Sequence, residues 1–254
     1  AYNATIENCN FTHNSAGDDG GAINWVGDVG LVKHIICYNN TGVAYADPVT
    51  GASSSLGGTM CIEGHNVTVT ESSFTLSKVL YNKGELNKTN AGAIAISGEN
   101  TTVSHSTFDT CTAPNNAGAI SIIGAHTTIL NCTFENCNAA EDGGAIEVNG
   151  TDCKLYNSTF INNFAGDDGG AINWIGSNGY VYGINCTNNR GIGLVTKGVE
   201  SHSVGGTISL AGDYIIVTNS NFTDSWATIA GGAVYIRGVN DIVANSTFTR
   251  CNES

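Results

Sequence analysis

The sequence predicts an all-β protein, a right-handed parallel β-helix of about 8–9 coils, each about 26 residues long with three short strands. Two observations predict it. A Gly-Ala-Ile-like tripeptide recurs along all 254 residues. The composition, with 33 glycines, 2 prolines, and abundant Asn and Thr, suits many short strands and tight turns. We expect one solenoid over residues 1–254.

The tripeptide sets the length of the coil. We name each coil by the glycine that begins its tripeptide and count positions from that glycine. The eight glycines are Gly21, Gly58, Gly92, Gly118, Gly144, Gly170, Gly206 and Gly232. Their numbers differ successively by 37, 34, 26, 26, 26, 36 and 26, so the basic period is 26, and three coils are longer than this by 11, 8 and 10.

Each coil repeats the same elements in order. Positions +2 and +4 are apolar and have the period of a strand. Position +6 is always glycine, which indicates a turn that needs positive φ or has no room for a Cβ. An aliphatic residue at +11 marks a second strand, and Phe or Cys at +16 marks a third. Three strands and three corners describe one coil, and stacking the coils supplies both the hydrogen bonds and the core.

Asparagine is frequent at +13. We expect these residues to face inward as a ladder that bonds from coil to coil, and a surface-turn asparagine is the alternative. They are Asn8, Asn131, Asn157, Asn219 and Asn245.

The sequence also contains a repeat longer than one coil. The ten residues Ala16–Trp25 recur unchanged as Ala165–Trp174, 149 residues later. No amphipathic cap is evident at either end, so we expect a segment excised from a longer array, with end-to-end self-association as an alternative.

The charge restricts the partners. The net charge of −13 disfavours nucleic acid and anionic membranes. No apolar stretch approaches the roughly 20 residues of a membrane-spanning helix, so we expect no membrane insertion in this segment.

Two motifs carry a resemblance to known families. Gly-Gly-Ala-Ile together with Phe-x-x-Asn, at Phe11–Asn14 and Phe160–Asn163, resembles the repeats of chlamydial polymorphic outer-membrane proteins and of adhesin-like surface proteins of methanogenic archaea. Both are similar to the pectate-lyase type of β-helix. Several coils depart from the pattern and end in Phe-x-x-Cys or Phe-x-x-Ser, as at Cys111, Cys137 and Ser225. The resemblance implies surface display and adhesion.

The pectate-lyase type of fold also occurs in polysaccharide lyases and glycoside hydrolases, so an enzymatic function is a further possibility. The pairs Asp18-Asp19 and Asp167-Asp168 match the aspartate pair of such hydrolases. Their Arg-x-Lys segment has no counterpart, and the chain has three arginines. We therefore expect a protein that is not an enzyme and has no catalytic residues.

One corner is acidic. In register, Glu141 and Asp142 stack on Asp167 and Asp168 of the next coil, about 5 Å away. Four carboxylates at this spacing either bind Ca²⁺ or form solvated turns. Ca²⁺ is the only cofactor that the sequence suggests.

The cysteines and the sequons fall on particular positions. Cys37 and Cys186 take the core position +16, whereas Cys111 and Cys137 share +19 on adjacent coils, close enough for a disulfide or for stacked free thiols. The inward +13 sequons, at Asn131, Asn157 and Asn245, should be unmodified. Glycosylation is expected at outward or turn sequons, namely Asn10, Asn66, Asn87, Asn100, Asn149, Asn185 and Asn221.

The three insertions, near 38–56, 76–90 and 187–204, should share one corner, where loops on a rigid scaffold commonly bind partners. We expect an extracellular cell-surface adhesin or stalk whose partners are glycans or proteins of a host or neighbouring cell. A self-assembling filament or sheath subunit is the alternative, and a polysaccharide lyase or glycoside hydrolase is the third class.

Overall fold

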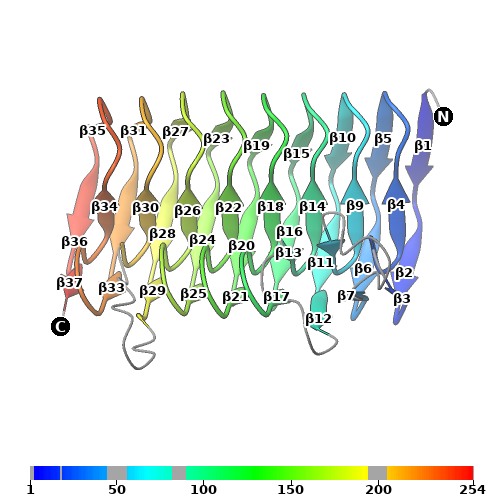
Figure 1. Cartoon of the computed structure of the whole chain (residues 1–254), viewed down its shortest axis with the longest axis horizontal. Coiled ribbons are helices and arrows are strands. Elements are labelled where there is room, and N and C mark those ends of the chain that lie inside the picture. Colours follow the sequence, from blue (N-terminus) through cyan, green and yellow to red (C-terminus); the bar gives the residue numbers. More distant parts are fainter. Residues whose placement is uncertain (1–2, 18, 45–55, 82–89, 194–204, 254) are drawn as a thin grey trace, which may run out of the picture.

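The computed structural model describes residues 3–17, 19–44, 56–81, 90–193 and 205–253. All regular secondary structure in these ranges is β-strand, and every strand pair is parallel. Figure 1 shows the coils side by side along one axis, from β1 at the N-terminal end to β37 at the C-terminal end. The predicted right-handed parallel β-helix is confirmed.

Four long sheets run the length of the stack, and a pair of short strands, β8 (Leu56–Gly57) and β13 (Asn90–Ala91), forms a fifth sheet. We call the long sheets A to D. Sheet D, which carries positions +2 to +4, consists of β4 (Ile23–Trp25), β9 (Met60–Ile62), β14 (Ile94–Ile96), β18 (Ile120–Ile122), β22 (Ile146–Val148), β26 (Ile172–Trp174), β30 (Ile208–Leu210) and β34 (Val234–Ile236).

Sheet A follows the first turn and carries the aliphatic position +11. It consists of β1 (Ala4–Glu7), β5 (Gly30–Lys33), β10 (Val67–Thr70), β15 (Thr102–Ser104), β19 (Thr128–Leu130), β23 (Lys154–Tyr156), β27 (Tyr180–Tyr182), β31 (Ile216–Thr218) and β35 (Ile242–Ala244).

Sheet B carries the aromatic position +16. It consists of β2 (Asn10–Thr12), β6 (Ile36–Tyr38), β11 (Ser73–Thr75), β16 (Thr107–Asp109), β20 (Thr133–Glu135), β24 (Thr159–Ile161), β28 (Asn185–Thr187), β32 (Asn221–Thr223) and β36 (Thr247–Thr249).

Sheet C adds a fourth, short strand to the three that the pattern predicted for each coil. It consists of β3 (Ser15–Gly17), β7 (Thr41–Ala44), β12 (Lys78–Tyr81), β17 (Thr112–Ala113), β21 (Asn138–Ala139), β25 (Phe164–Ala165), β29 (Arg190–Gly191), β33 (Trp226–Ala227) and β37 (Asn252–Glu253). Most of these strands have two residues, too few for a periodic apolar pattern, so the sequence did not reveal them.

The core is built from columns of like residues in register. Phe74, Phe108, Phe134 and Phe160 are fully buried, and each ring stacks on the next with centroids 4.9 Å apart. Because the register keeps each residue opposite its equivalent in the neighbouring coil, one apolar residue per position builds a continuous core.

Close packing of neighbouring coils accounts for the glycine at +6. A Cβ on Gly98 would lie 2.0 Å from the carbonyl oxygen of Gly64, its equivalent in the preceding coil. Of the two predicted reasons for this glycine, lack of room for a Cβ is therefore the one that applies.

Residues with left-handed backbone conformation recur at +8, before the strands of sheet A, and at +13 and +18, directly after the strands of sheets A and B. Asn, Asp and His hold many of these positions because they tolerate positive φ better than most residues. The five +13 asparagines belong to this set, with φ between 47° and 56°, and all five are exposed. The predicted inward ladder at +13 is therefore wrong, and the surface-turn alternative holds.

The inward ladder lies at +19 instead. Asn163 is 1 % exposed and donates from Nδ2 to the Phe134 carbonyl (3.1 Å) and to Asn189 Oδ1 (3.0 Å). Its own Oδ1 accepts from the Cys137 backbone N–H at 3.0 Å. The same pattern joins Asn14 to Asn40 near the N-terminal end. The asparagine of Phe-x-x-Asn thus bonds consecutive coils together.

The insertions share one corner, as predicted, because each leaves after sheet C and returns before sheet D. The predicted boundaries 38–56, 76–90 and 187–204 begin too early, since β7, β12 and β29 lie within them. Residues 45–55, 82–89 and 194–204 are outside the described residues.

Candidate functional site

Ionisable and polar side chains gather on the outer side of sheet D, at position +3. This position alternates with the core positions +2 and +4, so its side chain points away from the main core. Even so, Cys61, Ser121, Glu147, Asn173 and Ser209 are each no more than 2 % exposed. Cys61 belongs to a small apolar cluster separate from the main core.

Position −2, which precedes the glycine, contacts this row. Within one coil, Asn24 at +3 donates from Nδ2 to Asp19 Oδ2 at 2.7 Å. Between coils, Asn116 at −2 donates from Nδ2 to Glu147 Oε1 in the next coil at 3.0 Å. A side chain at +3 is thus flanked by the side chains at −2 of its own coil and of the preceding coil.

The four carboxylates predicted at the acidic corner do lie on stacked coils. The Asp167 N–H donates to the Glu141 carbonyl at 2.8 Å, and the Asp168 N–H donates to Asp142 Oδ1 at 3.0 Å. Burial raises the pKa of Asp142 to about 6, with repulsion from Asp167 and Glu141 adding to the effect and the Asp168 N–H opposing it. Burial and Asp167 raise the pKa of Glu141 as well.

Glu147 on β22 joins this group, and sequence reasoning missed it. Burial, followed by repulsion from Asp142, raises the pKa of Glu147 to about 7, whereas hydrogen bonds from Asn149 and Asn116 oppose the shift. Glu147 is 2 % exposed. The corner is therefore an acidic site with a buried centre rather than a purely solvated turn.

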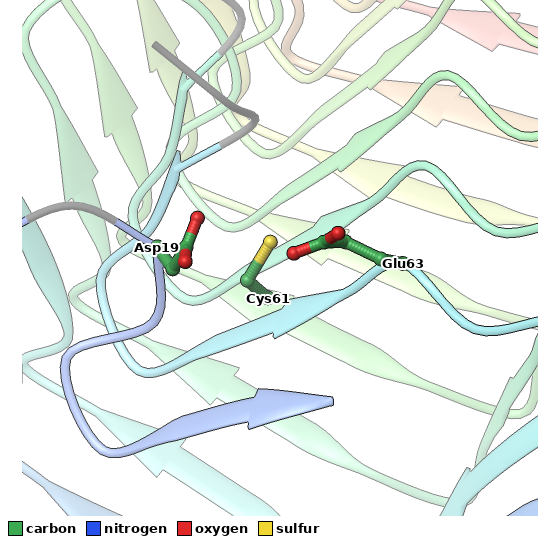
Figure 2. Close-up of side chains that lie close together, drawn as sticks. All are labelled: Asp19, Cys61 and Glu63. Atoms are coloured by element: carbon green, nitrogen blue, oxygen red, sulfur yellow. The ribbon is translucent and has the colours of Figure 1, made fainter. Parts of the chain in front are cut away.

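A second cluster lies on the same side of the stack nearer the N-terminus, at −2 of one coil and at +3 and +5 of the next. One ligand atom from each of Asp19, Cys61 and Glu63 lies within 4.8 Å of the others. Figure 2 shows the three side chains pointing toward one another, Asp19 from the turn before β4, Cys61 from β9, and Glu63 just beyond it. Two carboxylates and a thiol could hold a zinc-like divalent ion with a fourth position open.

The sequence contained a signal for this second cluster. Asp19 is at −2 of one coil, and Cys61 and Glu63 are at +3 and +5 of the next. Asn116 and Glu147 have the same −2 to +3 relation. Comparing positions across the corner, rather than along one column, would have found both sites.

All nine cysteines are free thiols in the structure. Cys111 and Cys137 are fully buried neighbours, so the predicted alternative of stacked free thiols describes them. Burial and the adjacent Cys137 raise the pKa of Cys111. Cys37 and Cys186 are buried in the phenylalanine column, as predicted.

Most of the predicted glycosylation sequons are accessible. Those that are exposed are Asn10, Asn66, Asn100, Asn185 and Asn221. Asn149 is half-buried and bonds to Glu147, and Asn87 lies outside the described residues. The three +13 sequons, at Asn131, Asn157 and Asn245, are exposed, so their predicted protection is wrong.

No family model, no curated protein and no solved structure matches this chain. Over the ranges that the structure describes, we find no helix with the length and apolar character of a membrane span.

Proposed function

We propose that this chain is the rigid stalk of an extracellular, non-enzymatic cell-surface adhesin, which displays its insertions along one edge. The observation that carries the proposal is that the chain leaves sheet C and returns to sheet D at the same corner of the stack for all three insertions. Nine strands at a spacing of about 4.8 Å make a rod of roughly 40 Å. Loops held in line on such a scaffold are suited to binding a surface.

The chemistry of the outer faces supports glycans or proteins of a host or neighbouring cell as partners. The outward column of sheet B just before the phenylalanine carries uncharged polar residues in neighbouring coils, as at Thr107, Thr133 and Thr159. Such rows offer hydroxyl donors and acceptors to a polar ligand. The net charge of −13 favours neutral or basic partners.

The test removes the insertions one at a time. Residues 45–55, 82–89 or 194–203 are deleted, which returns the lengthened coil to the basic 26 residues. We expect unchanged circular dichroism and melting, and loss of binding to intact cells or a glycan array in at least one variant. Binding that survives all three deletions would contradict display by the loops. Release of reducing ends from a polysaccharide would refute the non-enzymatic assignment.

A further inference from the structure

Three consecutive side chains in the +3 row of sheet D each have a buried oxygen without a hydrogen-bond partner in the part of the chain that the structure describes. They are Ser121 Oγ on β18, Glu147 Oε2 on β22 and Asn173 Oδ1 on β26. The strands place Glu147 directly between Ser121 and Asn173, and none of the three residues is more than 2 % exposed. Side chains elsewhere along the helix satisfy such oxygens with ladders, as Asn163 does.

Glu147 is the anomaly within this row. A buried polar group without a partner is costly, and a buried carboxylate without an opposite charge is far more so. Its carboxylate accepts hydrogen bonds from Asn116 and Asn149, but the charged groups that act on it are the carboxylates of Asp142 and Glu141, which repel it. The site therefore concentrates negative charge around the buried Glu147 Oε2, and no positively charged group among the described residues is recorded as acting on it.

The neighbours of Glu147 present further oxygens to the same place. Asp142 and Glu147 occupy −2 and +3 of one coil, the same two positions that Asp19 and Asn24 occupy in the Gly21 coil, where the two side chains are hydrogen-bonded. Asn173 lies directly opposite Glu147 in the next coil, and its Oδ1 is buried without a hydrogen-bond partner among the described residues.

We propose that this row is a binding site for a hard divalent cation, Ca²⁺ by preference, with Glu147 Oε2, Asn173 Oδ1 and the Asp142 carboxylate as its protein ligands. Carboxylate and amide oxygens are the ligands that Ca²⁺ prefers, and water completes its coordination. The ion offsets the repulsion between Glu147 and Asp142. The sequence placed a calcium site on the exposed corner, and the proposed site lies inward of it, with Glu147 at the centre.

The cluster of Figure 2 is a built-in comparison. It shares positions −2 and +3 with the Glu147 site, but it has a thiol at +3, Cys61, between the carboxylates of Asp19 and Glu63. A thiol favours a softer ion such as zinc, whereas the Glu147 site offers oxygen alone. Selectivity between Ca²⁺ and Zn²⁺ therefore distinguishes the two places.

The experiment uses the whole chain, stripped with a chelator and titrated with CaCl₂ at pH 7.5 by calorimetry and by thermal unfolding. We expect one Ca²⁺ bound per chain and a melting temperature higher by roughly 5–10 °C at a hundredfold excess over Kd. Glu147→Gln should abolish this shift, and without calcium it should melt above the unchanged protein, because it buries no unpaired charge. Glu135→Gln, on sheet B, and Asp19→Asn, in the Figure 2 cluster, are the controls and should keep the shift.

Three results would overturn the proposal. A calcium-induced shift that persists in Glu147→Gln would place the ion elsewhere, and one that is lost in Asp19→Asn would move it to the Figure 2 cluster. An unchanged melting temperature with millimolar CaCl₂, combined with a higher one in Glu147→Gln, would mean that Glu147 is neutralised by a proton.

Discussion

Asn163→Ala tests whether the buried ladder at +19 binds the coils together. The side chain of Asn163 satisfies two buried backbone groups, the Phe134 carbonyl and the Cys137 N–H, at 3.1 Å and 3.0 Å. Alanine leaves both without a partner. An unsatisfied buried group costs about 1–3 kcal/mol, so we expect the variant to lose about 2–6 kcal/mol of unfolding free energy.

Asn157→Gly is the matched comparison. Asn157 is at +13 with φ of 47° and an exposed side chain, so glycine fits the backbone and removes no buried bond. We expect a change within about 0.5 kcal/mol.

Urea unfolding monitored by circular dichroism measures both variants against the unchanged protein, expressed in a host that does not glycosylate. The ladder assignment would be refuted if Asn163→Ala were no less stable than Asn157→Gly. The reverse order, with Asn157→Gly strongly destabilised, would restore the inward ladder at +13.

Three further predictions follow from burial. Phe134→Ala should lower the free energy of unfolding in urea by about 3–5 kcal/mol, because the ring is fully buried between two others. Phe248→Ala should lower it clearly less, because that ring is partly exposed. Equal losses would contradict the stacked core. A thiol reagent at pH 8 should leave Cys132 and Cys153 unmodified in the folded protein, since burial raises the pKa of each thiol to about 11. After denaturation the reagent should modify nine thiols, and a count of seven would reveal a disulfide. Expression in a host that glycosylates should add sugar at exposed sequons such as Asn66 and Asn157, detectable by intact mass and absent from Asn→Gln variants, and an unmodified mass would remove the glycosylation hypothesis.

The fold was predictable because each position contacts its own equivalent in the next coil. Recurrence of the same residue types once per coil therefore gives the strand register directly, as Phe108 opposite Phe134 illustrates. The ladder was harder to place, since asparagine suits both a left-handed turn and an inward ladder. At +19, moreover, different residue types make the inward hydrogen bonds in different coils, for example Cys137 in one coil and Asn163 in the next. No single residue type therefore identifies the ladder in the sequence.

The candidate site was predictable along the stack but not across its corner. Glu141 and Asp142 were correctly placed over Asp167 and Asp168, because those residues share columns. Glu147 follows Asp142 in the same coil but belongs to a different column. The two residues come together at the corner between sheet C and sheet D. The strand of sheet C before that corner, β21, has only two residues, and so short a strand leaves no periodic signal in the sequence.

The two tryptophan coils show that position-by-position comparison also captures packing. Trp occupies +4 only in the Gly21 and Gly170 coils, and in those coils alone +9 is glycine and +16 is cysteine. A Cβ on Gly30 would lie 2.1 Å from the ring of Trp25, and a Cβ on Gly179 would lie 2.6 Å from that of Trp174. The indole thus fills the space that a +9 side chain takes elsewhere. Because an indole at +4 leaves no room for a Cβ at +9, a tryptophan at +4 requires a glycine at +9, and this paired change can be read directly from the sequence.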